Sequence, residues 1–308
     1  MSVAFVYPGQ GSQYVGMARA LRERSAVARE TFDEAEATLN LPIGRFADEG
    51  PEEDLTATEH LQPTLLTLSV AWTRALLQAG FPAPFAAAGH SLGEYAALVA
   101  ADCLDFPDAL RLVRLRGWLM QEAVPAGVGA MAALRGASPE QASAWCAAQP
   151  ELVELAAVNC PGQVSVAGLR AGVEAVLAQA EREGFHQSVM LKVSAPFHCS
   201  LLRPAAEGLA TALAALDLRM PRLFVPQNVD ARAPVDLDEL RVKLSDQVCR
   251  PVLWEACARA LLAAGVTRFV ELGPGSTIAG LLRKLDRKLD VVSIDRTGAF
   301  DALLGGIH

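Results

Sequence analysis

The stretch GHSLG, at residues 89–93, places Ser91 between two glycines. An apolar segment, 85–88, precedes it and an Ala/Leu-rich segment follows it, which predicts a strand, a turn and a helix. A serine in a G-x-S-x-G pattern stands on a sharp strand-to-helix turn that exposes its hydroxyl and requires small neighbours. The N–H of the next residue, Leu92, would then lie at a helix N-terminus, where it can face a developing oxyanion. The pattern predicts Ser91 as a hydrolase-like nucleophile.

A serine nucleophile needs a general base, and the chain has five histidines. His198 follows the segment VSAPF at the end of a predicted strand, from which it can reach the carboxyl edge of the main sheet. His90 adjoins Ser91, but a side chain at that position of the turn should diverge from the serine. His198 is therefore the predicted base, and the remaining histidines are interpreted as solvated or structural: His60, His186 and His308.

A single arginine interrupts an apolar helix face. The segment from Asp105 to Ala123 is predicted to be helical, with Pro107 in its first turn. At about 100° per residue, the residues within roughly 60° of Arg116 are apolar: Ala109, Leu112, Val113, Leu119, Met120 and Ala123. A buried guanidinium without an anion is costly, so Arg116 either pairs with a carboxylate of the protein or binds the carboxylate of a substrate. The pattern leaves both open, and it places Arg111 on the opposite, solvated face.

Three segments share one order of elements: a short apolar strand, a Gly-rich turn and a helix. They are 3–6 into YPGQGSQ, 85–88 into GHSLGEY and 269–272 into GPGSTIAGLL. Strands that alternate with helices predict an α/β fold with a mostly parallel sheet and helices on both faces. Such sheets carry their sites at the carboxyl ends of the strands, where all three turns fall.

The middle of the chain is predicted to form a smaller, inserted domain. Its expected elements are a strand at 128–134, a helix that begins at a Ser138–Gln141 capping box, strands at 153–158 and 163–167, a helix at 171–183 and a strand at 188–193. This βαββαβ order is that of the ferredoxin-like unit. The expected domains are therefore a hydrolase-like catalytic domain, 1–127 with 197–308, and a ferredoxin-like domain, 128–196.

The composition of the 308 residues narrows the class of protein. Hydrophobic residues make up 52% and charged residues 20%, which is typical of a globular chain, and the net charge of −8 disfavours a nucleic-acid partner. No uninterrupted apolar run reaches the length of a membrane span, and the N-terminus lacks the basic and apolar regions of a signal peptide. Six cysteines without C-x-x-C spacing indicate free thiols in a reducing cytoplasm, with no disulfide framework or metal site.

Taken together, the motifs resemble a known family. They occur in the family's order as PGQGSQ at 8–13, GHSLGEY at 89–95, RLRGWLMQEAVPAGVGAMAAL at 114–134, NCPGQVSVAG at 159–168, SAPFH at 194–198, QNVDA at 227–231, QVCRPVLW at 247–254 and FVELGPG at 269–275. Over essentially its whole length the chain is similar to the malonyl-CoA:acyl-carrier-protein transacylases, which supply malonyl groups to fatty-acid synthesis. The fold of that family, a hydrolase-like α/β core with a ferredoxin-like insert, agrees with the pattern of elements.

The resemblance implies a role for each matching residue. Ser91 would attack the malonyl thioester and His198 would be its general base. Gln247, in QVCRPVLW, matches the glutamine that orients this histidine. Arg116 matches the arginine that binds the malonyl carboxylate, which favours the substrate over a protein carboxylate.

Other positions follow from the same resemblance. Gln10 and Leu92 would supply the N–H groups of an oxyanion hole, and Phe197 resembles the malonyl-selective members rather than those that take methylmalonyl. Two positions depart from the family. Cys160 stands where many members have serine, and little effect is expected. Ser276 stands where a lysine is common, which can weaken a contact with coenzyme A or a carrier phosphate.

The implied reaction is a two-step acyl transfer without a metal or redox cofactor. Malonyl-CoA would acylate the serine, and the phosphopantetheine thiol of acyl carrier protein would then take the malonyl group. A monomer is expected to dock the acidic carrier through a basic patch, for which the candidates are Arg203, Arg283, Lys284 and Lys288. The alternatives are a free-standing polyketide acyltransferase, the transacylase subunit of malonate decarboxylase, a serine thioester hydrolase and a non-catalytic binding module.

Overall fold

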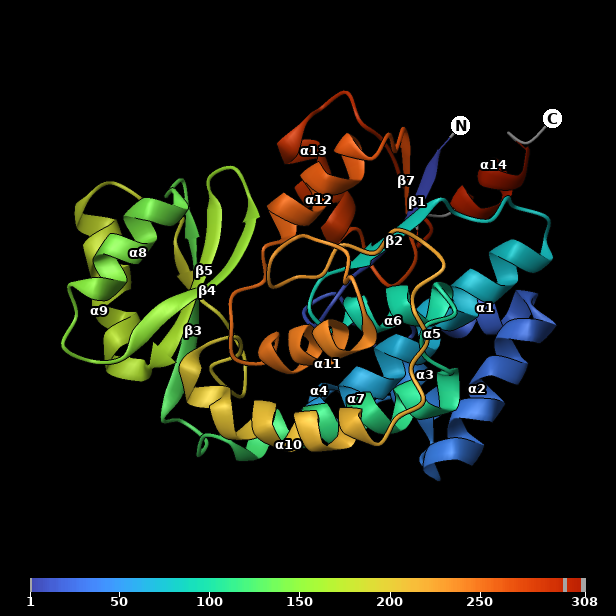
Figure 1. The fold of residues 1–308 in the computed structure, drawn as a ribbon, viewed down its shortest axis with the longest axis horizontal. Helices are drawn as coiled ribbons and strands as arrows, with labels where there is room; N and C mark the ends of the chain where they lie inside the picture. The colour runs from blue at the N-terminus through green and yellow to red at the C-terminus, as the bar shows by residue number, and fades with distance from the viewer. Residues whose placement is uncertain (1, 296–297, 306–308) are drawn as a thin grey trace. The chain divides into compact units, whose positions relative to one another are not determined.

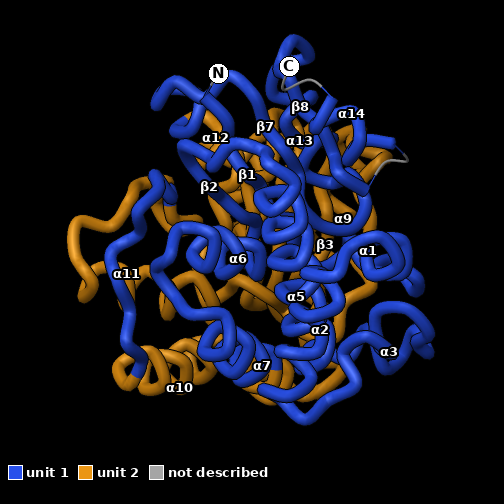
Figure 2. Tube along the Cα trace, turned by 90° about the vertical axis from the view of Figure 1, so that its right-hand side faces the viewer, with its two compact units in different colours: residues 1–117, 216–226, 260–308 blue, residues 118–215, 227–259 orange. Residues whose placement is uncertain are grey.

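The protein divides into two compact units (Figure 2). The computed structural model describes residues 2–295 and 298–305. Unit 1 comprises residues 1–117, 216–226 and 260–308, and unit 2 comprises residues 118–215 and 227–259. Of the four boundaries, 117/118 falls inside helix α7 (Phe106–Glu122) and 259/260 falls inside helix α12 (Trp254–Ala263).

A parallel sheet in the order β2-β1-β7-β8 forms the centre of unit 1 (Figure 1). Its strands are β1 (Val3–Tyr7), β2 (Ala86–Gly89), β7 (Arg268–Glu271) and β8 (Asp290–Ser293). Every residue of β1 is buried, as expected for an inner strand of a parallel sheet. Tyr7 pairs with Gly89 and Val6 with Glu271, so the three strands that precede Gly-rich turns end at one edge. The predicted α/β fold and the common edge of the three turns are confirmed.

The helices of unit 1 include one long, almost fully buried helix, α5. It runs over Thr58–Gln78, and the hydroxyls of Thr64, Thr67 and Thr73 donate to the carbonyl oxygen one turn earlier, as Thr67 does to Pro63 at 2.7 Å. Polar side chains are thereby satisfied inside an apolar helix. The other helices of this unit are α1 (Arg19–Arg24), α2 (Ala26–Leu39), α3 (Ile43–Asp48), α4 (Glu52–Thr56), α6 (Gly93–Ala100), α13 (Thr277–Leu285) and α14 (Ala299–Gly305).

Unit 2 contains an antiparallel sheet in the order β4-β5-β3-β6. Its elements are β3 (Gly129–Arg135), α8 (Pro139–Ala147), β4 (Val153–Cys160), β5 (Gln163–Leu169), α9 (Arg170–Arg182) and β6 (Val189–Met190). The βαββαβ order is as predicted, and the last strand is shorter than expected. The capping box is also confirmed, because the Ser138 hydroxyl accepts from the N–H of Gln141 and the Gln141 side chain accepts from the N–H of Ser138.

Unit 2 is larger than the inserted domain predicted at 128–196. It also includes the short helix η1 (Ser200–Leu202), α10 (Arg203–Ala214) and α11 (Leu237–Asp246). The two units are defined by compactness, whereas the predicted domains were defined by an insertion in the sequence. The predicted boundaries, 1–127 with 197–308 for one domain and 128–196 for the other, therefore stay a prediction. Within the residues that the structure describes, no helix combines the length and the hydropathy that a membrane span requires.

Candidate active site

Ser91 lies on the sharp turn between β2 and α6. Its φ is 52°, in the left-handed region that a residue with a side chain rarely adopts. A Cβ on Gly89 would lie 1.9 Å from the carbonyl carbon of Gly93, and a Cβ on Gly93 would lie 2.2 Å from the carbonyl oxygen of Tyr7. Both glycines of the pattern are therefore required by close backbone packing. The turn presents a half-buried Ser91 at the carboxyl edge of the sheet.

Arg116 contacts this serine directly. Arg116 is 1% exposed, and its Nη2 donates to Ser91 Oγ at 3.0 Å while its Nη1 donates to Gln62 Oε1 at 2.9 Å. Burial lowers the pKa of Arg116, and the neighbouring Tyr95 and Glu94 act in the opposite direction. A fixed, desolvated cation thus lies within hydrogen-bond distance of the candidate nucleophile, where its attraction for an anion is stronger than in water.

The helix face predicted for Arg116 is largely buried in the structure. The members of that face that are buried are Ala109, Leu112, Val113 and Met120, whereas Leu119 and Ala123 are half-buried. Arg111 is exposed and pairs with Asp108 on the solvent side of the helix, as expected for the opposite face. The apolar periodicity of α7 is therefore what places a guanidinium in the interior.

The loop that carries Gln10 packs on the Ser91 turn. A Cβ on Gly9 would lie 2.6 Å from the carbonyl oxygen of His90, so the two backbones touch. Within the loop, the Ser12 hydroxyl donates to the carbonyl of Gly9 at 2.8 Å. Leu92 is the N-cap of α6 and is 1% exposed. The backbones of Gln10 and Leu92 therefore belong to the two segments that meet at this turn.

Glu271 supports the third turn of the same edge. This residue ends β7 and is fully buried, and its carboxylate accepts from the N–H groups of Ile278 at 2.9 Å and Ala279 at 3.0 Å in α13. Burial raises the pKa of Glu271 to about 7, and the two backbone hydrogen bonds oppose that rise. The departure Ser276 is an exposed N-cap of α13 whose side chain makes no cap hydrogen bond.

His198 lies in unit 2, in a segment that is also in the left-handed region. Its φ is 63°, it is 5% exposed, and its Nδ1 lies 2.7 Å from the backbone carbonyl oxygen of Gln247. A carbonyl oxygen can only accept, so the hydrogen bond assigns the proton to Nδ1. The neutral ring then carries its lone pair on Nε2, which is the form that a general base requires.

Gln247 contacts the histidine ring through its main chain. Its side chain points to another partner, since Gln247 Nε2 donates to Asn228 Oδ1 at 3.4 Å. Gln247 is fully buried and is the C-cap of α11, so its carbonyl belongs to the end of that helix. Phe197, beside the histidine, is 6% exposed. The departure Cys160 is buried at the end of β4.

The other histidines have different surroundings. His60 stacks on Phe46 and its Nδ1 lies 3.1 Å from the carbonyl oxygen of Asp54, which is a structural setting. His186 is exposed beside Glu181, and His90 is half-buried in the Ser91 turn. His308 lies outside the described residues.

Sequence reasoning missed several buried polar residues around the predicted ones. Gln62 holds the Arg116 guanidinium, Tyr95 lies with its ring centroid 5.5 Å from it, and Asn228 holds the Gln247 side chain. The signal available was a polar residue inside an apolar stretch, as in HLQPTLL around Gln62.

The structure describes no group of three or more His, Cys, Asp or Glu side chains that could hold a metal ion within residues 2–295 and 298–305.

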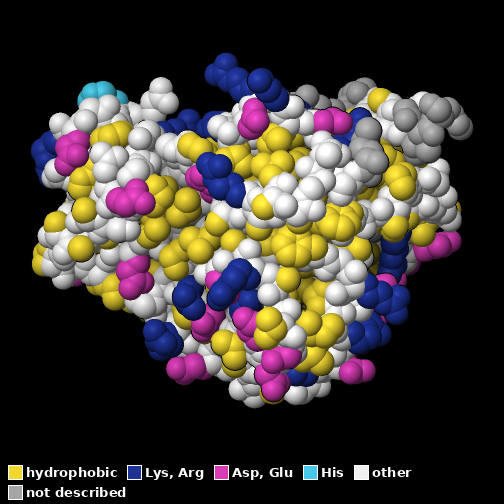
Figure 3. Space-filling model, turned by 45° about the horizontal axis from the view of Figure 1, so that its top comes forward, with side chains coloured by type: hydrophobic (Ala, Val, Ile, Leu, Met, Phe, Trp, Pro, Cys, Tyr) yellow, Lys and Arg dark blue, Asp and Glu magenta, His cyan; other side chains and the backbone are white. Residues whose placement is uncertain are grey.

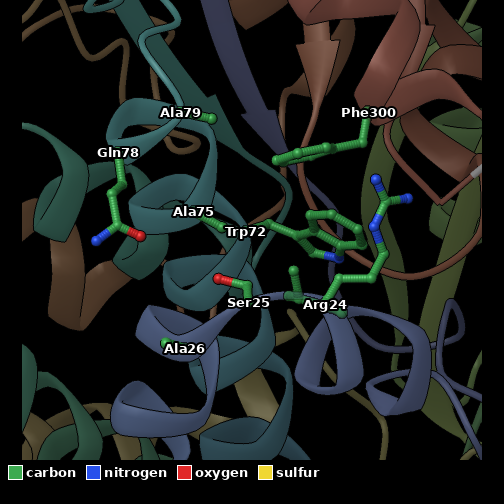
Figure 4. A pocket seen from close by; sticks show the side chains of 9 residues that line it. Arg24, Ser25, Ala26, Trp72, Ala75, Gln78, Ala79 and Phe300 are labelled. Carbon is green, nitrogen blue, oxygen red and sulfur yellow. The ribbon is translucent and has the colours of Figure 1, made fainter.

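One cavity in unit 1 lies apart from these residues (Figure 4). It has a volume of about 250 Å³ and is lined by residues of α1, α2, α5 and α14 together with Ser25 and Ala79. The rings of Trp72 and Phe300, which belong to this lining, have centroids 5.9 Å apart. None of the predicted site residues lines it.

Comparison with known proteins places the whole chain in one family. Residues 4–297 match the model of the acyl transferase domain. The chain is 42% identical to a malonyl CoA-acyl carrier protein transacylase of Bacillus subtilis, with 95% of this chain and 93% of the relative covered. It superposes with a TM-score of 0.96 on an acyl-carrier-protein S-malonyltransferase of Burkholderia pseudomallei, at 43% identity over 99% of this chain and 100% of that one.

A further solved relative is a malonyl-transacylase in complex with a type II polyketide synthase acyl-carrier protein. It superposes with a TM-score of 0.96 at 38% identity, and the alignment covers 99% of this chain and 100% of that one. These matches agree with the resemblance seen in the motifs. The chain belongs to the malonyl-CoA:acyl-carrier-protein transacylase family, within the acyl transferase domain family.

Proposed function

We propose that this protein transfers a malonyl group from malonyl-CoA to the phosphopantetheine thiol of acyl carrier protein, through a malonyl ester on Ser91, and so supplies fatty-acid synthesis. The observation that carries the proposal is the 3.0 Å contact between the buried guanidinium of Arg116 and Ser91 Oγ. An acyl group bound to this oxygen lies beside a desolvated cation. A malonyl group has a carboxylate to offer that cation, whereas an acetyl group has none.

The first half of the proposed reaction forms the ester. His198 Nε2 takes the proton of the Ser91 hydroxyl as Oγ attacks the thioester carbonyl carbon. The N–H groups of Gln10 and Leu92 stabilise the resulting oxyanion. The C–S bond then breaks, and the coenzyme A thiolate leaves with the proton that the imidazolium returns. In the second half, the carrier thiol attacks the ester by the same steps in reverse.

The hydrogen-bond partner of His198 Nδ1 is a neutral carbonyl rather than a carboxylate. A carboxylate at that place would stabilise the imidazolium by its charge, whereas the Gln247 carbonyl offers only a dipole. The carbonyl still fixes the ring tautomer. A thiol nucleophile is more acidic than an alcohol or water, so attack of the carrier thiol on the Ser91 ester needs less help from the base than hydrolysis of that ester does. This arrangement therefore supports transfer to a thiol over hydrolysis.

Labelling tests the function directly. Radioactive malonyl-CoA should label wild-type protein at Ser91 and leave Ser91→Ala unlabelled, and holo-acyl carrier protein should remove the label as malonyl-carrier. Release of free malonate at the same rate without the carrier would identify a thioester hydrolase instead. A protein that takes up no label would be a binding module.

The role of Arg116 is tested by substrate preference. Arg116→Ala should lose most of its preference for malonyl-CoA over acetyl-CoA, by about two orders of magnitude, because a hydrogen-bonded buried ion pair is lost. The matched control is Arg111→Ala on the exposed side of the same helix, which should keep the wild-type preference. Unchanged preference in Arg116→Ala would refute the role.

The carrier remains open between two pathways. The relative solved with a type II polyketide synthase carrier supports a polyketide carrier as the second candidate. On the face shown in Figure 3, basic and acidic side chains are interspersed. Of the candidate docking residues, Arg203, Lys284 and Lys288 are exposed, whereas Arg283 donates to the backbone carbonyl of Val291 at 2.7 Å. Transfer rates to purified fatty-acid and polyketide carriers would distinguish the pathways.

Location and assembly belong to the same proposal. A cytoplasmic location agrees with six cysteines that form no disulfide within the described residues: Cys103, Cys146, Cys160, Cys199, Cys249 and Cys257. Light scattering on the purified protein would test the oligomeric state.

A further inference from the structure

Unit 2 contains a buried lysine that the transfer reaction does not use. Lys243, on α11, is 5% exposed, and lysines are rarely buried to this extent without partners. Its Nζ contacts three acceptors: Glu239 Oε1 at 3.0 Å, Asp230 Oδ2 at 3.1 Å and the backbone carbonyl oxygen of Arg232 at 3.3 Å. An ammonium group has three protons, so this cluster satisfies the cation completely.

The cluster joins α11 to the turn at 227–232. Asp230 also accepts from the backbone N–H of Arg232 at 3.1 Å and pairs with its guanidinium at 3.1 Å. The Arg232 carbonyl, besides meeting Lys243, accepts from the N–H of Gln227 at 3.1 Å. Two positive and two negative side chains therefore form a neutral group that fixes one helix to one turn.

Both parts that the cluster joins support Gln247. From the helix, the carbonyl oxygen of Lys243 accepts the N–H of Gln247 at 2.9 Å. From the turn, Asn228 accepts from the Gln247 side chain at 3.4 Å. The carbonyl of Gln247 in turn holds His198 Nδ1 at 2.7 Å. An unbroken series of contacts thus leads from the buried ammonium to the histidine ring.

Support of this kind matters because the histidine partner is a helix-terminal carbonyl. The last carbonyls of a helix lack a partner within the helix, and helices as short as α11, with 10 residues, are unstable alone. A shift of about 1 Å in a group that orients a catalytic residue costs about a hundredfold in rate. The end of α11 must therefore be held by contacts outside the helix.

We propose that Lys243 is a positioning residue for the proposed catalytic base: by fixing α11 to the 227–232 turn, it sets the Gln247 carbonyl that orients His198. The inference rests on the proposed function only for its effect on rate. The effect of Lys243 on the tautomer of the His198 ring does not depend on whether the protein transfers malonyl groups. The positioning role and the proposed function can therefore be tested separately.

Nitrogen NMR on protein with ¹⁵N-labelled histidine tests the ring directly. In the wild type, the His198 signals, assigned by their loss in His198→Ala, should show a protonated Nδ1 and an unprotonated Nε2. Lys243→Met, which keeps the length of the side chain and removes the charge, should mix the two tautomers. Lys243→Arg should restore the wild-type signals in part. A wild-type pattern in Lys243→Met would overturn the proposal.

Kinetics supply the second readout. Single-turnover acylation by malonyl-CoA should slow about tenfold in Lys243→Met, with the malonyl-CoA concentration at half-maximal rate unchanged. In a His198→Ala background the same substitution should have no further effect on the residual rate. An equal loss in both backgrounds would show that Lys243 is merely structural and would overturn the proposal.

One control variant and one alternative variant complete the test. Arg259→Met removes a cation from an exposed pair with Glu255 on α12 and should change neither readout. Glu239→Gln keeps the lysine and removes one of its charged partners, so it serves if Lys243→Met does not fold. It should move both readouts in the same direction by a smaller amount, and no movement in Glu239→Gln would contradict the proposal.

Discussion

The turn that carries Ser91 and the segment that carries His198 are held by different physical means. Both residues have a positive φ, 52° and 63°. Ser91 is fixed by backbone packing, because Gly89 and Gly93 leave no room for a Cβ. His198 is fixed by a hydrogen bond to the end of a helix that depends on buried Lys243. The position of the proposed nucleophile therefore depends on two glycines that lack side chains, and the position of the proposed base depends on contacts between segments that are distant in the sequence.

The largest effect is expected from the packed turn. Gly89→Ala places a Cβ 1.9 Å from a backbone carbon, which the turn cannot accept without moving Ser91. We expect a loss of acylation of at least about a thousandfold and a loss of more than about 4 kcal/mol in the free energy of unfolding. Acylation rates and denaturant unfolding measure the two quantities.

Gly280→Ala is the matched control for this change. Gly280 lies in α13, and a Cβ there meets no atom within 4 Å. The substitution should raise stability by about 1 kcal/mol through helix propensity and leave acylation unchanged. Normal acylation in Gly89→Ala would show that the turn is not set by backbone packing.

Substitutions of His198 and of its partner Gln247 should slow acylation by different amounts. His198→Ala should slow acylation by about a hundredfold to ten-thousandfold, the usual contribution of a general base. Gln247→Met should cost less than about tenfold, because the main-chain carbonyl that contacts the ring remains while the side-chain bond to Asn228 is lost. Steady-state kinetics would measure both, and equal losses in the two variants would mean that the Gln247 side chain does the orienting.

The same contrast explains how much could be predicted from the sequence. The Ser91 turn, the two sheets and the Ser138 capping box were predictable because glycines, apolar periodicity and caps are local patterns. The burial of Arg116 followed from the period of its own helix. In each case the information lay within a few residues of the feature.

The remaining features depend on long-range contacts that no local pattern encodes. Gln62 lies 54 residues from Arg116, and Gln247 lies 49 residues from His198. The motif QVCRPVLW identified Gln247 but could not show that its main-chain carbonyl makes the contact with the ring. Lys243 reads in the sequence as one more charge on an amphipathic helix. Only the tertiary structure shows it buried among carboxylates.

The two regions should also differ in their response to pH. In unit 2, burial raises the pKa of Asp230, but the Arg232 N–H and the Lys243 ammonium more than offset it, so that pKa lies below its usual value. The stability that Asp230 contributes is then present above its unfolded pKa and is lost as the pH falls through the folded pKa. In unit 1, burial shifts the pKa of Glu271 in the opposite direction, up to about 7.

Glu271→Gln tests this difference. The folded protein retains a proton on Glu271 between its usual pKa of 4.5 and its raised value of about 7, where the unfolded chain has released it. The stability contributed is therefore fully present below 4.5 and is lost as the pH rises through about 7. Relative to wild type, Glu271→Gln should gain about 3 kcal/mol of stability between acidic and alkaline pH. Amide exchange at Ile278 and Ala279, whose N–H groups meet this carboxylate, would measure the change locally. Asp230→Asn, measured in parallel, should be less stable than wild type at neutral pH and should approach the stability of wild type only as the pH falls. The same pH trend in both variants would show that the two regions do not differ in this respect.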